Sequence, residues 1–450
     1  MSKSIRIDAK TSLFGMTWPI FIELVLQMLV GNVDQIMLSH YSDTAVAAVG
    51  NANQIINVLI LMFSVVSMAT TILVSQYLGA GNREKVSQIY TLAVLVNLAI
   101  SLAVAAAIFL INSRMFVWMA TPGELIGDAT TYILINGGLI FLQGLFMTYS
   151  AIFRSNALMK ESMFIAVVIN LTNIFGNFLL INGAGAIPAL GVAGAAISSC
   201  LSRAIGVVIM IYLFRREVSG EISLRVLRPF PGNLLKRLLL IGLPSGGESL
   251  SYNMTQMCCL AFLNMLGTAV VTTKVYAVMF SMLAYLYVTA IAQSSQIVVG
   301  HLVGAGEMDD ADRRTMRTLR SSVPVSFGIA LLLFLCSDFL FGLFTQNSEI
   351  LRMGKLVLGV EVALEVGRAL NIVLVRALQA AGDVRFPVVV GIISQWLVSV
   401  GIGYLLGIVL HWGIAGIWAA MAADECLRGT VMLIRWRSGV WRTKVQIERE

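Results

Sequence analysis

One pattern occurs twice in this chain, as SQYLGAGN at residues 75–82 and as GHLVGAGE at residues 300–307. The two copies are 225 residues apart, and the same offset places Pro19 on Pro244. Self-similarity at a fixed offset is the signature of an internally repeated architecture. We therefore expect two similar halves that fold in the same way.

A second repeat marks the end of each half. LGVAGAA at 190–196 precedes WGIAGIW at 412–418 by 222 residues. Between the halves lies a polar stretch, RREVSGEISLRVLRPFPGNLLKR, whose PFPG segment interrupts any continuous helix. We expect an N-terminal lobe over residues 1–214, a cytoplasmic linker over 215–237 and a C-terminal lobe over 238–450.

Composition identifies the medium in which both halves fold. Of the 450 residues, 58% are apolar and 12% charged, whereas soluble domains are about 25% charged. This composition excludes a soluble globular protein and a disordered chain. The apolar runs are long and do not alternate with polar residues, so they predict helices and not a β-barrel. The sequence predicts an all-α polytopic membrane protein of twelve transmembrane helices in two pseudo-symmetric six-helix lobes, with spans near 13–38, 46–78, 88–112, 127–154, 161–182, 189–214, 238–266, 269–302, 318–343, 350–380, 386–410 and 413–434.

The basic residues predict the orientation. With the N-terminus inside, 24 of the 31 Lys and Arg residues fall in cytoplasmic loops, and only Arg114, Arg352 and Lys355 fall outside. Cytoplasmic loops of membrane proteins collect Lys and Arg. We therefore expect a multi-pass protein of the inner (plasma) membrane with both termini in the cytoplasm. The same bias explains the net charge of +7 without a nucleic-acid partner.

Two groups of side chains in the first half stand out. A charge at the bilayer centre costs about 2.5–3.5 kcal/mol, yet Asp34 lies deep in the first span. A carboxylate there can take up a proton or bind a cation, although an interfacial capping role is the alternative. In the fifth span Asn173 and Asn177 share a helical face, where they can coordinate Na⁺ or hydrogen-bond a carboxylate, or simply join helices. Ser198 or Ser199 of the sixth span can complete the set.

In the second half, Glu361 and Glu365 lie one turn apart in the tenth span, and Arg368 follows three residues later. One interpretation is a structural ion pair between Glu365 and Arg368. The alternative interpretation is that the two acids form a cation-binding site. Glu248 in the seventh span matches Glu23 at the offset of 225, which is compatible with a shared structural role as well as with a cation ligand.

Glycines at the ends of the second and eighth spans do not indicate nucleotide binding. The chain has no GKS or GKT segment, so Gly81 and Gly306 are interpreted as helix C-caps. It also has no HExxH motif and no clustered Cys and His residues. We expect no enzyme activity and no cofactor, and an ion gradient as the energy source.

Taken together, the first-span Pro, GNVD at 31–34, LGAGN, VGAGE and VRALQAAGDVRFP at 375–387 resemble the multidrug and toxic compound extrusion (MATE) family of secondary transporters, of the NorM or DinF type. The resemblance covers nearly the whole chain. It implies alternating access and export of drugs in exchange for ions.

The resemblance implies roles for single residues. The coupling carboxylate of the family, fifteen residues after the first-span Pro, is Asp34 here. The fifth-span acid of the relatives is replaced by Asn177. The acid eleven residues before Arg376 is Glu365, with Glu where relatives have Asp. The seventh-span Glu of those relatives falls on Tyr252, and Glu248 lies one turn earlier.

These observations predict a monomeric efflux antiporter for small organic cations, working in the lipid bilayer and coupled to H⁺ or Na⁺. The expected ion-coupling residues are Asp34, Asn173, Asn177 and Ser199, the first three of which would hold a Na⁺ ion. The expected substrate or cation ligands are Glu23, Glu248, Tyr252, Glu361 and Glu365. The alternative is a flippase for lipid-linked precursors on a related two-lobe fold, which would need several central basic residues. Only Arg203, Lys274, Arg368 and Arg428 lie inside spans.

Overall fold

The computed structural model describes residues 11–183 and 188–445, and the secondary structure within these ranges is helical, with no strand. By its internal contacts the chain divides into two compact units. Unit 1 extends from Ile22 to Gly242, and unit 2 holds residues 11–21 and those from Leu243 onward. Two helices, α1 (Leu13–Ser39) and α8 (Gly232–Met265), therefore contribute residues to both units.

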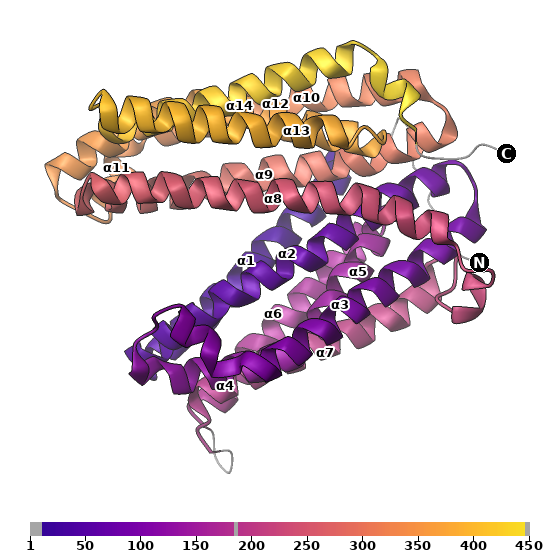
Figure 1. Ribbon diagram of the computed structural model, residues 1–450, viewed down its shortest axis with the longest axis horizontal. Helices are drawn as coiled ribbons and strands as arrows, with labels where there is room; N and C mark the ends of the chain where they lie inside the picture. The colour runs from indigo at the N-terminus through magenta and orange to yellow at the C-terminus, as the bar shows by residue number, and fades with distance from the viewer. Residues whose placement is uncertain (1–10, 184–187, 446–450) are drawn as a thin grey trace. The chain divides into compact units, whose positions relative to one another are not determined.

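Unit 1 is built from the first seven α-helices and a short 3₁₀ turn (Figure 1). Within it α2 packs against α3, α4 and α5, and α7 packs against α4, α5 and α6. The core between them consists of small and branched residues such as Ala48, Val49 and Ile133. The elements are α1 (Leu13–Ser39), α2 (Asp43–Gly79), α3 (Arg83–Trp118), α4 (Gly123–Gly138), α5 (Phe141–Ser155), α6 (Met159–Ile181), α7 (Gly191–Glu217) and η1 (Leu224–Leu227).

Unit 2 centres on one helix, α12, which packs against α9, α10 and α14 (Figure 1). The eleventh span of the chain begins as α-helix at Arg385 and changes to π-helix at Gln395 without a break. Such π segments occur often at functional sites. The elements are α8 (Gly232–Met265), α9 (Thr268–Ala305), α10 (Met308–Leu335), α11 (Ser337–Gly342), α12 (Ser348–Ala380), α13 (Arg385–Ser394), η2 (Gln395–Ile402), η3 (Leu405–Val409), α14 (Gly413–Arg437) and η4 (Val440–Thr443).

Twelve helical segments are long enough to cross a membrane. Eight contain a stretch that is long and apolar enough to span a membrane, and α4 with α5 forms a ninth that is bent by 47°. The other three are α8, α12 and α14 of 34, 33 and 25 residues. They fall short of the apolar standard because they carry charged and polar side chains such as Glu248, Glu361 and Asp424, all buried or half-buried.

Two expected spans differ from the structure. The fourth, expected as one helix over 127–154, is broken at Leu139 and Ile140. The ninth, expected over 318–343, begins at Met308 and ends at Leu335. Hydropathy does not predict either end of α10. The first turns of this helix are polar, so its start is placed too late, and the chain stays apolar through the break before α11, so its end is placed too late as well.

The repeated glycines act as helix caps, as expected. Gly81 and Gly306 have φ angles of +77° and +84°, a conformation that glycine adopts without steric cost. Beside them the backbone N–H of Asn82 donates to Tyr77, and that of Glu307 to Leu302. These bonds close the last turns of α2 and α9.

Candidate functional site

Asp34 is the centre of a buried polar cluster in unit 1. Its side chain is 2% exposed, and each carboxylate oxygen accepts one hydrogen bond. Asn177 on α6 donates to Oδ1 at 2.6 Å, and Ser199 on α7 donates to Oδ2 at 2.8 Å. Both partners are neutral, so they stabilise the carboxylate without cancelling its charge.

The two partners are themselves linked. The Nδ2 atom of Asn173 donates to the hydroxyl of Ser199 at 3.0 Å, and the amides of Asn173 and Asn177 are 3.4 Å apart. The structure thus brings together all four residues expected to couple ions: Asp34, Asn173, Asn177 and Ser199. Ser198, the alternative to Ser199, instead donates to the backbone oxygen of Asn173. One buried acceptor, Oδ1 of Asn177, has no hydrogen-bond partner.

Two further residues near this cluster were missed by sequence reasoning. Tyr132 on α4 is buried and interacts electrostatically with Asp34. Arg203 lies one turn after Ser199 on α7, interacts electrostatically with Asp34, and donates to Oδ1 of Asn136 at 3.0 Å. The electrostatic interaction of this guanidinium with the carboxylate disfavours a further metal cation there.

Glu23 occupies a separate place in unit 1. Its side chain is 0% exposed, and its Oε1 atom accepts hydrogen bonds from Ser150 on α5 at 2.6 Å and from Gln27 at 3.1 Å. Among the described residues it shares no hydrogen-bond partner with Asp34. The structure therefore separates Glu23 from Asp34, with which it shares α1, and from the partners of Asp34 on α6 and α7.

In unit 2 the acids of the tenth span surround an arginine. Arg368 pairs with Glu365, three residues earlier on α12, and lies 3.6 Å from Glu361. Trp418 on α14 donates its indole N–H to Glu361 at 2.6 Å. The ion pair considered for Glu365 is thus present, while its Oε2 atom remains buried and without a hydrogen-bond partner.

A second set of charges lies on α14, and sequence reasoning missed its two acids. Arg428 Nη2 is 2.8 Å from both Asp424 and Glu425. Asn371 on α12 donates to Glu425 at 2.8 Å, and Ser394 on α13 donates to Asp424. The signal was in the sequence, because both acids stand inside an apolar span, one turn before an arginine.

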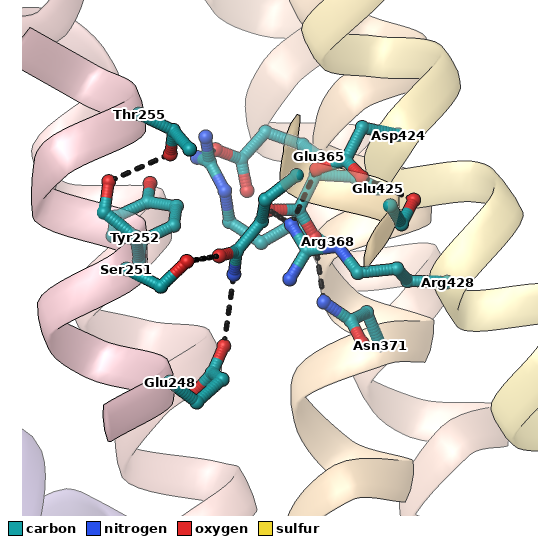
Figure 2. Close-up of polar contacts among 12 residues, drawn as sticks. Glu248, Ser251, Tyr252, Thr255, Glu365, Arg368, Asn371, Asp424, Glu425 and Arg428 are labelled. Carbon is teal, nitrogen blue, oxygen red and sulfur yellow. Dashed lines mark hydrogen bonds and ion pairs between the residues drawn. The ribbon is translucent and has the colours of Figure 1, made fainter. Parts of the chain in front are cut away.

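Glu248 joins the same region from α8. Gln395, the first residue of the π-helical segment, donates to Glu248 at 2.9 Å and accepts from Ser251 at 3.2 Å. Figure 2 shows Glu248, Ser251 and Tyr252 along α8, opposite the charged side chains of α12 and α14. Tyr252 interacts electrostatically with Arg368 and Glu425. The five residues expected to form the substrate or cation site therefore do not lie together. Glu248, Tyr252, Glu361 and Glu365 gather in unit 2, whereas Glu23 lies in unit 1.

The unit 2 cluster has an excess of acids. We define it by its charged members, five acids and two arginines: Glu248, Glu361, Glu365, Asp424, Glu425, Arg368 and Arg428. Fully ionised, these groups would carry a net charge of −3. A buried excess of this kind needs protons or a cationic ligand to balance it. Among the described residues no group of three or more His, Cys, Asp or Glu side chains has the arrangement of a metal site.

The repeat shows why the two units are not equivalent. The offset of 225 places Cys259 at the position of Asp34, and the offset of 222 places Ser399 at that of Asn177. The thiol of Cys259 lies 3.9 Å from the backbone oxygen of Ser399. The contact between helices is kept in unit 2, but its carboxylate is replaced by an uncharged group.

Comparisons with known proteins agree with this architecture. The MatE family model matches residues 19–179 and again 244–405, so the two matches begin 225 residues apart. "Uncharacterized transporter YisQ" of Bacillus subtilis is 40% identical over 437 residues, which is 97% of this chain and 96% of YisQ. "Probable multidrug resistance protein NorM" of Thermotoga maritima is 25% identical over 447 residues, 98% of this chain and 95% of NorM.

A crystal structure of MATE in the bent conformation superposes with a TM-score of 0.90 at 19% identity, over 97% of each chain. This likeness confirms the fold expected from the sequence, twelve transmembrane helices in two lobes.

Proposed function

This chain belongs to the MatE family of membrane transporters, and from that premise we propose that it is an antiporter that exports small organic cations in exchange for protons. It is a multi-pass protein of the plasma membrane, not an enzyme, and its energy comes from an ion gradient without a cofactor. The proposal concerns the coupling ion, the substrate class and the residues that serve them. It includes both termini in the cytoplasm and a monomeric transporter.

The contacts of Asp34 carry the proposal for the coupling ion. Its two hydrogen-bond partners are neutral donors, Asn177 and Ser199, and the guanidinium of Arg203 interacts with it electrostatically. A Na⁺ ion needs several oxygen ligands whose lone pairs face it, whereas these donors present hydrogens to the carboxylate. A proton can bind Asp34 without rearranging its neighbours, so H⁺ fits the site better than Na⁺.

The substrate class rests on the charge of the unit 2 cluster. The five acids of the cluster, four of them buried and Glu248 half-buried, outnumber its two arginines. This charge favours a positively charged ligand and opposes an anionic one such as a lipid pyrophosphate. Both arginines already contact acids. We therefore propose that organic cations bind through Glu248, Glu365 and their neighbours, and that the two arginines of the cluster are not available to bind the pyrophosphate that the flippase alternative requires.

Efflux from proteoliposomes tests the proposal. Purified wild-type protein should expel ethidium when a pH gradient is imposed, and should not respond to a Na⁺ gradient at constant pH. Asp34→Asn should abolish the pH-driven efflux, because it removes the proton site and keeps the shape. Asp43→Asn, an exposed acid nine residues later, serves as the control and should export normally.

Efflux driven by Na⁺ alone, or undiminished export by Asp34→Asn, would contradict the assignment of the coupling ion. Movement of a lipid-linked precursor in place of ethidium would favour the flippase.

A further inference from the structure

Glu23 is a buried acid that the coupling site at Asp34 does not use. It lies eleven residues before Asp34 on α1, or about 16 Å along the helix axis. Oε1 accepts hydrogen bonds from Ser150 and Gln27, while Oε2 is buried and has no hydrogen-bond partner among the described residues. An acid so placed needs a compensating positive charge, whether a proton or an ion.

No described cation supplies that charge. The contacts of Glu23 are with Ser150 and Gln27, and it has no ion pair in the described part of the chain. Among the described residues, none of the titratable groups on its own helix and on the two helices that contact it forms an ion pair with Glu23. They are Asp34 on α1, Tyr149 and Arg154 on α5, and Lys160 and Glu161 on α6. A proton on Glu23 is therefore the simplest way to neutralise it.

The serine that binds Glu23 continues into a chain of hydroxyls. Ser150 Oγ on α5 is 2.6 Å from Glu23, and Ser162 Oγ on α6 is 2.9 Å from Ser150. All three side chains are at most 1% exposed. In the pair of serines either hydroxyl can be the donor. Three groups from three helices thus form one line of hydrogen bonds that can run in either direction.

We propose that Glu23, Ser150 and Ser162 form a second proton-binding site in unit 1, which we call the Glu23 relay. This inference rests on the proposed proton coupling and adds a second exchangeable proton to it. With Glu23 ionised, Ser162 donates to Ser150 and Ser150 donates to Glu23. With Glu23 protonated, Oε1 donates to Ser150, and Ser150 donates to Ser162.

Proton uptake through this line is balanced. A hydronium ion that reaches the buried Ser162 donates a proton to it and leaves as water, the original proton of Ser162 passes to Ser150, and that of Ser150 passes to Oε1 of Glu23. One proton enters at α6, and one carboxyl O–H bond is made. Release reverses each transfer. Ser162 lies within the first turn of α6, which begins at Met159, so the line leads from the middle of α1 toward the α5–α6 connection.

The surroundings of Glu23 suit a proton and not a metal ion. The two groups that contact it, the hydroxyl of Ser150 and the amide nitrogen Nε2 of Gln27, present hydrogens to the carboxylate. A metal ion would need several oxygen lone pairs. The described residues offer no cluster of three acids, histidines or cysteines at this place.

Infrared difference spectra between acid and alkaline pH test the relay without any substrate. The sample is the purified full-length protein in lipid nanodiscs. Wild type should show the carbonyl band of a protonated carboxyl group that Glu23→Gln removes and Asp34→Asn keeps. Ser150→Ala should move the frequency of this band, because the carboxyl group of Glu23 loses the hydroxyl that hydrogen-bonds it. Ser162→Ala gives a second measurement if Ser150→Ala does not fold.

The control is Ser101→Ala, a buried serine whose hydroxyl donates to the backbone oxygen of Asn97 and lies outside the relay. It should leave the band unchanged. Identical spectra for wild type and Glu23→Gln, or a band that responds to Na⁺ at constant pH, would overturn the proposal.

A transport measurement separates this inference from the proposed function. Glu23→Gln should lower the number of protons exchanged per ethidium by about one, and an unchanged number would overturn the second exchangeable proton. If Asp34→Asn still exports normally, the proposed coupling fails, yet the infrared band of Glu23 still decides whether the relay exists.

Discussion

The side-chain amide of Asn177 donates a 2.6 Å hydrogen bond to Asp34, which lies 143 residues earlier in the chain. This bond fixes the end of α1 against α6 at the point where a charge is buried. A donor to a carboxylate stabilises the ionised form, so the amide influences the pH at which Asp34 exchanges its proton.

Asn177→Ala should raise the pH at which export is half-maximal. Hydrogen bonds to charged groups contribute about 1.5–3 kcal/mol, and 1.36 kcal/mol corresponds to about one pH unit. Since the lost donor favoured the ionised carboxylate, protonation extends to higher pH by about one to two units. Initial rates of ethidium efflux across a pH series measure the shift. Asn170→Ala is the control, because its amide donates to Ala166 on the same helix; equal shifts in both variants would disprove the specific role of Asn177.

The ion pair on α12 should be more sensitive to loss of its base than of its acid. Arg368 forms ion pairs with both Glu361 and Glu365. Glu365→Gln leaves the arginine with one acid, whereas Arg368→Gln leaves two buried acids without the arginine that pairs with them. Breaking a buried pair typically costs about 3–5 kcal/mol. We expect a larger fall in melting temperature for Arg368→Gln than for Glu365→Gln, with partial recovery in the double variant. Thermal unfolding in detergent measures this order, and the reverse order would show that another group compensates the acids.

Much of the fold and of the unit 1 cluster could be predicted from the sequence. Long apolar runs gave the number of spans, and helical spacing placed Asn173 and Asn177 on one face toward the first-span acid. These features depend on local periodicity, which a sequence displays directly.

The remaining contacts depend on which helices pack together. Asn371 reaches Glu425, and Trp418 reaches Glu361, across 54 and 57 residues. Nothing local in α12 or α14 specifies those partners. The bend between α4 and α5 was likewise invisible, because Leu139 and Ile140 at the break are as apolar as the helices on either side.

Thiol labelling tests the proposed orientation. In a variant whose native cysteines are replaced by serine, Arg225→Cys places a thiol on the exposed η1 turn between the lobes. Glu124→Cys places one at the exposed start of α4. If the termini are cytoplasmic, an impermeant maleimide should label the second site in intact cells and the first only after lysis. The opposite pattern would invert the topology.

The charge of the unit 2 cluster should set the preference among cationic substrates. The five acids of the cluster outnumber its two arginines, so the cluster attracts a dication more strongly than a monocation of similar shape. Ethidium and propidium provide such a pair, with one and two positive charges. Replacing Glu425 by Gln removes one negative charge while Asn371 and Arg428 keep hydrogen-bonding groups opposite it. We expect the concentration for half-maximal efflux to rise about tenfold for propidium and about threefold for ethidium, in keeping with a modest loss of Coulombic attraction in a partly screened site.

Asp338→Asn is the matched control, because this exposed acid pairs with Lys355 outside the cluster. It should change neither value, since exposed ion pairs contribute little. Equal losses for the two dyes in Glu425→Gln would mean that the acid supports packing and does not sense substrate charge. A loss confined to ethidium would contradict an electrostatic role for the cluster, because the additional charge of propidium should always make it the more sensitive probe.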